Sequence, residues 1–219
     1  MAPALYGHPF SSFTQKALIA LYENSTAFEF RLLGPDQPAH QAELKLRSPM
    51  GKFPMLVDGG RSLVEASVII EYLQQVYPGP VRLIPDDPAA ALEVRFLDRF
   101  FDLYVMDAMQ VAVNAALKVV PMTPEDGLAH SKVRLEPAYR WLDGHMTGKT
   151  WAAGGDFSLA DCAAAPSLFY ADWVYQIPEQ YAALRAYRAR LLARPSFARA
   201  VDEARYFRPF FPLGAPDRD

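Results

Sequence analysis

The chain has 219 residues, 51% of them hydrophobic and 21% charged, and a formal net charge of −3 at pH 7. This length suffices for one or two compact domains, and the slight negative charge with scattered basic residues argues against a nucleic-acid partner. The sequence contains one cysteine, four scattered histidines and no apolar run near the roughly 20 residues of a membrane span. Residues 1–6 lack the charged and apolar segments of a secretory signal. We therefore expect a cytoplasmic protein with no metal site, internal disulfide or membrane partner.

Strand and helix patterns alternate in the first third of the chain. Residues 4–7 are short and apolar, an amphipathic helical pattern follows from Phe13, and alternating apolar residues at 28–33 indicate a second strand. The segment 41–47 suggests a short, poorly ordered helix. The apolar run and the Asp-Gly-Gly turn within 55–60 predict a hairpin. With the helix that follows, this βαβ then ββα order is the one that a thioredoxin-like domain needs.

The remainder of the chain has only helical patterns. Apolar residues recur at three- and four-residue steps from Val94 to Ala115, which predicts one long helix, and Thr123 followed by Pro and two acids starts another. Helical patterns return between Leu159 and Ala204, and no strand pattern appears after residue 60. We predict a thioredoxin-like domain over 1–77, a proline-rich linker over 78–88 and an all-helical domain over 89–219.

Pro54 and Glu65 flank the predicted hairpin and have two interpretations each. Pro54 opens a strand, a position where a residue without an N–H is tolerated. If the Phe53–Pro54 bond is cis, however, the backbone of Phe53 turns outward and its polar groups are available to a ligand. Glu65 at a helix start is favoured by the helix dipole alone, but a carboxylate beside the N–H groups of a helix N-terminus is also suited to binding a peptide.

Ser11 and Ser12 lie where the first strand gives way to the first helix. A serine hydroxyl there can cap the helix by accepting a hydrogen bond from its N–H groups. It can also donate to a thiolate held at the positive end of the helix dipole. Such a setting lowers the pKa of a thiol from about 8.5 by an estimated one to two units, which is about 1.4–2.8 kcal/mol.

Three separated motifs resemble the serine-type cytosolic glutathione transferases, with zeta-, theta- and tau-like features, over nearly the whole chain. Residues 11–16, Ser-Ser-Phe-Thr-Gln-Lys, resemble the Ser-Ser-Cys-x-x-Arg and Ser-Pro-Phe-x-x-Arg segments of that family. Residues 48–54, Ser-Pro-Met-Gly-Lys-Phe-Pro, and the Glu-Ala-Ser of 65–67 resemble its glutathione-binding half. Two departures are Ser48 for the usual Asn and Ala66 for the usual Ser, so a hydroxyl contact to glutathione is missing at 66.

The resemblance implies a thioredoxin-like domain that binds glutathione as co-substrate, an electrophile bound between the two domains, and a homodimer. It implies a cis Pro54 and the thiol activator Ser11, with Ser12 and Tyr6 as the competing candidates. Basic groups at the glycyl carboxylate, backbone at the cysteinyl unit and the helix start at the γ-glutamyl end would bind glutathione. The implied glutathione-binding residues are Phe13, His40, Lys52, Phe53, Pro54, Glu65, Ala66 and Ser67. The apolar positions expected to line the electrophile pocket are Phe10, Tyr104, Met109, Trp173 and Phe207.

Cys162 follows a segment that predicts a structural role. Ser158 and Asp161 have the spacing of a capping box, and Phe157 and Cys162 have that of a hydrophobic staple. We therefore expect Cys162 in the core, and we expect substitution of Asp161 to cost about 1 kcal/mol. The Ser-x-x-Asp segment also resembles the capping motif of the sixth helix in the transferase family.

Two other functions remain open on the sequence. The serine motif also resembles the zeta-type maleylacetoacetate isomerases, whose substrate pocket needs basic residues. Arg95 and Arg99 are the obvious candidates on the long helix, and periodicity places both on its outer face. A non-catalytic protein of the same fold that binds glutathione or other ligands would be consistent with Ala66. The transferase reaction is the preferred interpretation.

Overall fold

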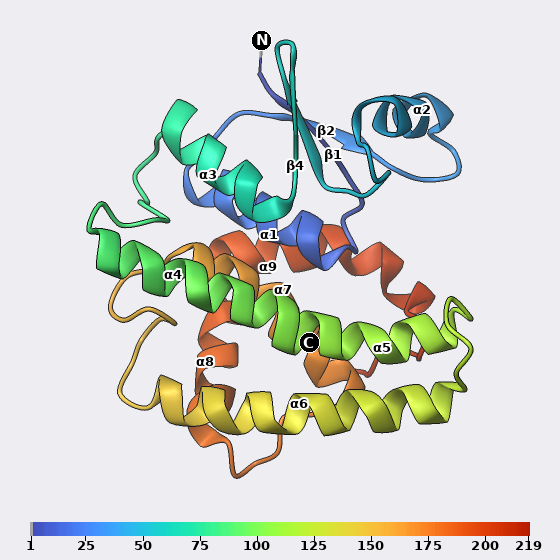
Figure 1. Ribbon diagram of the computed structural model, residues 1–219, viewed down its shortest axis with the longest axis vertical. Coiled ribbons are helices and arrows are strands. Elements are labelled where there is room, and N and C mark those ends of the chain that lie inside the picture. The colour runs from blue at the N-terminus through green and yellow to red at the C-terminus, as the bar shows by residue number, and fades with distance from the viewer. Residues whose placement is uncertain (1) are drawn as a thin grey trace.

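A four-stranded mixed sheet forms the N-terminal part of the computed structural model, which describes residues 2–219 (Figure 1). Met1, the first residue of the predicted 1–77 domain, lies outside the described residues. The strands follow the order β2-β1-β3-β4, in which β1 and β2 are parallel and the other pairs are antiparallel. They are β1 (Ala4–Gly7), β2 (Glu29–Leu32), β3 (Met55–Asp58) and β4 (Arg61–Val64). The expectation of no strand after residue 60 was wrong, since β4 is the second arm of the hairpin.

Helices cover both faces of this sheet because successive strand residues point to opposite sides. Leu5 and Leu56 lie in one apolar cluster with α1 (Ser12–Glu23) and α3 (Ala66–Val76). Tyr6 and Met55, the next residues in register, lie in a second cluster with Leu44 of α2 (Pro38–Arg47). Helix α2 is longer than expected because Pro38 occupies its first turn, where a missing N–H costs nothing.

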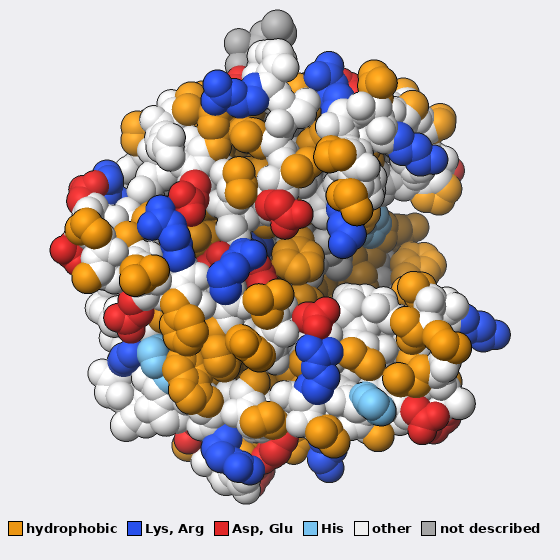
Figure 2. Space-filling model, viewed as in Figure 1, with side chains coloured by type: hydrophobic (Ala, Val, Ile, Leu, Met, Phe, Trp, Pro, Cys, Tyr) orange, Lys and Arg blue, Asp and Glu red, His pale blue; other side chains and the backbone are white. Residues whose placement is uncertain are grey.

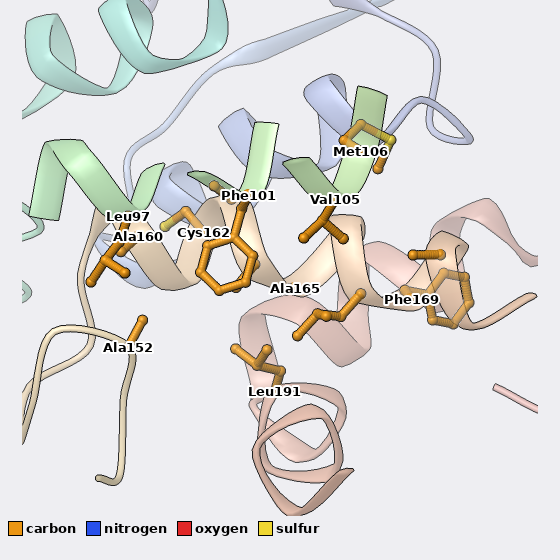
Figure 3. Close-up of a cluster of buried hydrophobic side chains, with 14 of the residues drawn as sticks. Leu97, Phe101, Val105, Met106, Ala152, Ala160, Cys162, Ala165, Phe169 and Leu191 are labelled. Atoms are coloured by element: carbon orange, nitrogen blue, oxygen red, sulfur yellow. The ribbon is translucent and has the colours of Figure 1, made fainter. Parts of the chain in front are cut away.

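The rest of the chain is a helical bundle built around one buried helix. Its elements are α4 (Pro88–Phe100), a π-helical segment η1 (Phe101–Met106), α5 (Asp107–Ala116), α6 (Pro124–Met146), α7 (Leu159–Val174), α8 (Ala182–Ala193), α9 (Pro195–Ala204) and a 3₁₀ segment η2 (Arg205–Phe210). Helix α7 is buried along nearly its whole length. Figure 3 shows Phe101 and Val105 pointing from η1 toward α7, where Cys162 lies, fully buried as expected. No helix within residues 2–219 is both long and apolar enough to cross a membrane.

The long helix predicted from Val94 to Ala115 is interrupted by the π-helical turn at 101–106. Within it the N–H of Asp107 donates to the carbonyl of Asp102, five residues earlier. The buried residues of this segment are Phe101, Asp102, Val105 and Met106. The apolar periodicity across this segment therefore predicted the helix but not its wide turn.

Helix α1 lies between the sheet and the bundle and packs on α3, α7 and α9. Leu18 and Leu21 belong to the apolar cluster under the sheet, whereas Ile19 and Ala20 belong to the core of the helical bundle. The same helix thus contributes side chains to two cores, and its N-terminus faces the junction between them.

Candidate active site

Ser11 is the N-cap of α1. Its φ and ψ of −87° and 126° are extended, and its Oγ accepts a hydrogen bond of 3.4 Å from the N–H of Thr14. Ser12 is the first residue of the helix, and Phe13, which is 38% exposed, projects from its first turn. The hydroxyl of Ser11 and the positive end of the α1 dipole therefore lie at the same point.

The loop before β3 has the backbone that the motif implies. The Phe53–Pro54 peptide bond is cis, and the Ser48 hydroxyl donates to the carbonyl of Lys52 at 3.1 Å. Gly51 has a φ of +62°, a left-handed conformation that glycine adopts without strain. These features bring the chain from α2 to β3 in a tight turn with Lys52 exposed on it.

Glu65 occupies the N-cap of α3 in an unusual backbone conformation. Its φ of 69° lies in the left-handed region, which costs a non-glycine residue on the order of 1–3 kcal/mol. Its carboxylate is exposed, while Ala66 behind it is buried. Strain of this kind is tolerated where the surrounding structure requires it, and here it presents the first N–H groups of α3 beside a carboxylate.

The first turn of α1, through Phe13, the loop before β3 and the start of α3 line a hollow of about 150 Å³, and Ser11 stands just outside this lining, two residues before Phe13. Figure 2 shows the surface hollowed on its right side, between the sheet-containing part above and the helical part below. The small hollow has Lys52 as its basic group and Glu65 as its acidic group, so it can accept a zwitterionic ligand. Its wall consists of Phe13, Ser48, Pro49, Met50, Lys52, Phe53, Pro54, Val64, Glu65 and Ala66.

Two of the predicted glutathione-binding side chains lie elsewhere. The Nδ1 of His40 is 2.9 Å from the carbonyl oxygen of Leu32, and its ring packs edge-on to Tyr6, so His40 is held against β2. Ser67 accepts a hydrogen bond from Lys16 Nζ at 3.0 Å and donates to Asp98 Oδ2 at 2.9 Å. The Ser67 hydroxyl is therefore engaged with α1 and α4 and cannot replace the missing hydroxyl of residue 66.

The partners of Ser67 form a charge cluster between the two parts of the molecule. Lys16, 1% exposed, lies 2.5 Å from Asp98 Oδ1 and 2.7 Å from Asp102 Oδ2. Arg99 bonds to both carboxylates, at 2.8 and 2.7 Å, and to Ser67. Burial raises the pKa of Asp102, and Lys16 opposes that rise.

Arg95 and Arg99 are exposed on α4, as the periodicity predicts, and both side chains reach toward α3. Arg95 pairs with Glu71 of α3 at 3.0 Å, and Arg99 reaches Ser67 at the start of that helix. Both arginines are therefore directed at the N-terminal part and are paired with carboxylates. Periodicity predicts the exposed face of α4, but it does not show that this face lies next to α3 or which carboxylates pair with the two arginines.

The candidate electrophile-pocket residues divide into two groups. The rings of Phe10 and Trp173 have centroids 6.2 Å apart, and Phe207 packs on His8 at 4.3 Å, close to the start of α1 in the chain. Met109 is 3% exposed within the bundle core, so it lines no pocket. Tyr104 is 57% exposed and packs against Phe100 on the surface of the long helix, so it lies apart from Phe10, Trp173 and Phe207.

Tyr6 is unsuited to be the thiol activator. Its hydroxyl donates to Glu43 at 2.6 Å, and burial together with this hydrogen bond raises its pKa to about 12.

The predicted capping residues at the start of α7 are hydrogen-bonded within the core: Asp161 accepts from the N–H of Ser158 at 2.9 Å and from the Tyr187 hydroxyl at 2.6 Å. Burial raises the pKa of the Cys162 thiol well above its usual range, so it is no nucleophile.

Residues 5–81 match the sequence model described as the glutathione S-transferase N-terminal domain, and residues 125–190 match the model described as its C-terminal domain. Together the two matches cover more than half of the chain. The chain belongs to the glutathione S-transferase family. The hollow at the start of α1 therefore lies within the family's N-terminal domain.

Proteins similar to this chain differ in their descriptions. A probable maleylacetoacetate isomerase of Vibrio cholerae is 28% identical over 93% of this chain and 97% of its own length. A stringent starvation protein A homolog of Coxiella burnetii is 25% identical over 91% of each chain. Among solved structures, a glutathione S-transferase from Methylobacillus flagellatus with GSH bound is 27% identical, covers 91% of this chain and 98% of its own, and superposes with a TM-score of 0.78.

The charged residues that link the two parts of this fold were not predicted from the sequence. Lys16 interrupts an otherwise apolar helix face, and Asp98 and Asp102 stand four residues apart within an apolar seam. A basic residue and two acids at core positions are a recognisable signal for a buried ion pair, because unpaired charges are rarely buried. The partners could not be assigned, since the two helices are far apart in the sequence.

Proposed function

We propose that the protein is a glutathione transferase that joins the glutathione thiolate to a small apolar electrophile. The observation that carries this proposal is the convergence of the α1 N-terminus, the cis Phe53–Pro54 loop and the α3 N-terminus on one hollow. An extended peptide can pair with the backbone of Phe53, and its charged ends can bind to Lys52 and Glu65. The family's structural relative with GSH bound supports glutathione as that peptide.

Each end of glutathione has a matching group in this arrangement. Lys52 would neutralise the glycyl carboxylate, and the Phe53 backbone would pair with the cysteinyl unit. Glu65 would bind the γ-glutamyl ammonium, and the N–H of Ala66 at the α3 N-terminus would bind its carboxylate. The absent hydroxyl at 66 makes this end depend on backbone groups alone, because Ser67 is engaged elsewhere.

Ser11 would stabilise the thiolate without giving up its role as a cap. A hydroxyl has one donor hydrogen and two acceptor lone pairs, so Ser11 Oγ can accept from the Thr14 N–H and donate to sulfur together. The bound thiolate then attacks the electrophilic carbon, a C–S bond forms, and the leaving group departs. The protein contributes orientation and stabilisation of the anion. The aromatic residues Phe10, Trp173 and Phe207 would contact the electrophile.

The pKa of bound glutathione tests this proposal directly. Thiolate absorbance should titrate one to two units below free thiol, roughly at pH 6.5–7.5, in the wild-type protein. Ser11→Ala should return the pKa toward the free value, whereas Ser12→Ala should leave it near wild type. Binding with an unshifted pKa would favour a non-catalytic carrier, and absence of binding would reject the proposal.

A second candidate is glutathione-dependent isomerisation of a conjugated dicarboxylate. The V. cholerae relative, described as a probable maleylacetoacetate isomerase, matches this chain over nearly its whole length. Against it, Arg95 and Arg99 are already paired with carboxylates and leave little positive charge for a dianionic substrate. Comparing turnover of maleylacetone with that of an aryl halide separates the two, and faster isomerisation would replace the transferase assignment.

The proposal includes a homodimer in the cytoplasm. Apolar side chains gather on the surface between α4 and α6, where Phe96 is 50% and Trp141 40% exposed (Figure 2). An exposed aromatic group of this kind is typical of a protein–protein interface. Sedimentation equilibrium of the wild type and of Phe96→Glu would test the assembly, and a monomeric wild type would reject it.

A further inference from the structure

The segment from His8 to Ser11, between β1 and α1, has nearly every backbone polar group hydrogen-bonded. The N–H of Phe10 donates to His8 Nδ1 at 3.2 Å, and the N–H of Ser11 donates to the His8 carbonyl at 2.9 Å. The Pro9 carbonyl accepts from Gln15 Nε2 at 3.0 Å. A loop with this density of bonds has a defined conformation, so the position of Ser11 depends on them.

One of these bonds comes from the helical bundle. Tyr170 of α7 donates its hydroxyl to the carbonyl of Phe10 at 2.9 Å, and Gln15 Nε2 donates to the same hydroxyl at 3.2 Å. Tyr170 is 3% exposed, and its ring packs edge-on to Phe10 with centroids 5.4 Å apart. Burial raises the pKa of Tyr170, so its hydroxyl remains a donor at any working pH.

We propose that Tyr170 is a positioning residue for Ser11, which it holds through the Phe10 carbonyl and Gln15. The inference rests on the proposed function, in which Ser11 activates the glutathione thiol. Phe10 and Ser11 are consecutive, so a shift of the Phe10 peptide turns the extended backbone of Ser11 and moves its Oγ. The helical domain thereby sets the geometry of a group that belongs to the other domain.

Catalytic geometry of this kind is sensitive to small shifts. Displacing a reacting or stabilising group by about 1 Å costs up to about a hundredfold in rate. A lost hydrogen bond at a buried peptide carbonyl leaves that carbonyl unsatisfied and free to move toward a new donor. We therefore expect a reduction of roughly tenfold in kcat/KM when the Tyr170 hydroxyl is removed, accompanied by a rise in the pKa of bound glutathione.

The test compares Tyr170→Phe with Tyr139→Phe in the full chain. Tyr139 is also buried and donates its hydroxyl to a backbone carbonyl, that of Tyr175, at 3.0 Å. Both variants lose one partly buried hydroxyl–carbonyl bond. Tyr170→Phe also removes the acceptor of the longer bond from Gln15, which keeps the Pro9 carbonyl as its partner, so its loss of stability should be similar or slightly larger. Only Tyr170→Phe should raise the pKa of bound glutathione and speed amide hydrogen exchange over residues 10–12.

The outcomes distinguish this proposal from the proposed function. A wild type that lowers the glutathione pKa, with Tyr170→Phe identical to it in pKa and exchange, would refute the positioning role alone. A wild type that does not lower the glutathione pKa would reject both proposals. If Tyr170→Phe loses far more stability than Tyr139→Phe, Gln15→Met tests the same hydrogen-bond network instead. It removes the donor to both the Pro9 carbonyl and the Tyr170 hydroxyl. An unchanged pKa of bound glutathione in that variant would overturn the inference.

Discussion

Lys16→Met should destabilise the protein because it removes the cation from a buried charge cluster. The Lys16 side chain is 1% exposed, and the carboxylates that it contacts, Asp98 and Asp102, are 3% and 9% exposed. Methionine has nearly the volume of the lysine stem, so the packing is preserved and the loss is electrostatic. After the change, only Arg99, itself 48% exposed, faces the two carboxylates.

The size of the loss follows from the burial of these carboxylates. Removing one partner of a buried ion pair costs about 3–5 kcal/mol, because the remaining charge is left without compensation. Arg99 still contacts both carboxylates, so we expect the lower end, about 3 kcal/mol in the free energy of unfolding. For a chain of this length that is a fall of about 6–12 °C in Tm.

Urea and thermal unfolding measure this change, and pH provides an internal check. The pKa of Asp102 is already raised by burial and rises further without Lys16, so acid neutralises this carboxylate in the folded variant. The destabilisation should therefore be smaller at pH 5 than at pH 8. The triple change of Lys16→Met, Asp98→Asn and Asp102→Asn removes both signs of charge and should recover most of the loss. A loss below about 1 kcal/mol for Lys16→Met at pH 8 would refute the reasoning.

Three further predictions follow from single contacts. Asp161→Ala should cost about 3 kcal/mol rather than the 1 expected for a cap, because it leaves buried donors without an acceptor, as thermal unfolding can measure. Gly7→Ala should lower the Tm, since its Cβ would lie 2.6 Å from Cγ2 of the buried Thr14. Burial lowers the pKa of His8, and NMR should place it below the usual value of about 6.5. Because the unfolded chain binds the proton first, stability should fall as pH drops through this window.

Each of these predictions has a matched control. Tyr187→Phe removes one of the donors to Asp161, so combining it with Asp161→Ala should cost less than the sum of the two. Gly34→Ala meets nothing within 4 Å and should leave the Tm unchanged. His8→Gln should lack the acid dependence, and an unaltered pH profile in that variant would show that another group is responsible.

The parts of the structure that could be predicted from sequence depend on local rules. The order of strands and helices follows periodicity and turn residues, and the walls of the hollow come from two motifs at the ends of elements. Phe53, Pro54 and Glu65 lie together because a hairpin joins their segments directly. Contiguous motifs of this kind retain their geometry wherever the rest of the chain lies.

Features that depend on how helices meet could not be predicted. Met109 and Trp173 have similar helical patterns, yet one lies in the bundle core and the other beside Phe10, because only the packing of α5 and α7 distinguishes them. The π-helical turn shifts every later residue of the long helix relative to α1, which periodicity does not reveal. Tyr170 belongs to no motif in the sequence, and only its contact with Phe10 indicates a role.

The double membership of α1 in two cores has a consequence for how this protein can be divided. A fragment that ends in the linker would expose Ile19 and Ala20, and a helical fragment alone would lack these two side chains and Ile70, which pack into its core. We therefore expect the two parts to unfold together, although their sequence patterns are those of two separate modules. If the first half were exchanged for that of a distant relative, the new α1 would also have to provide side chains that pack into the core of the helical bundle, as Ile19 and Ala20 do here.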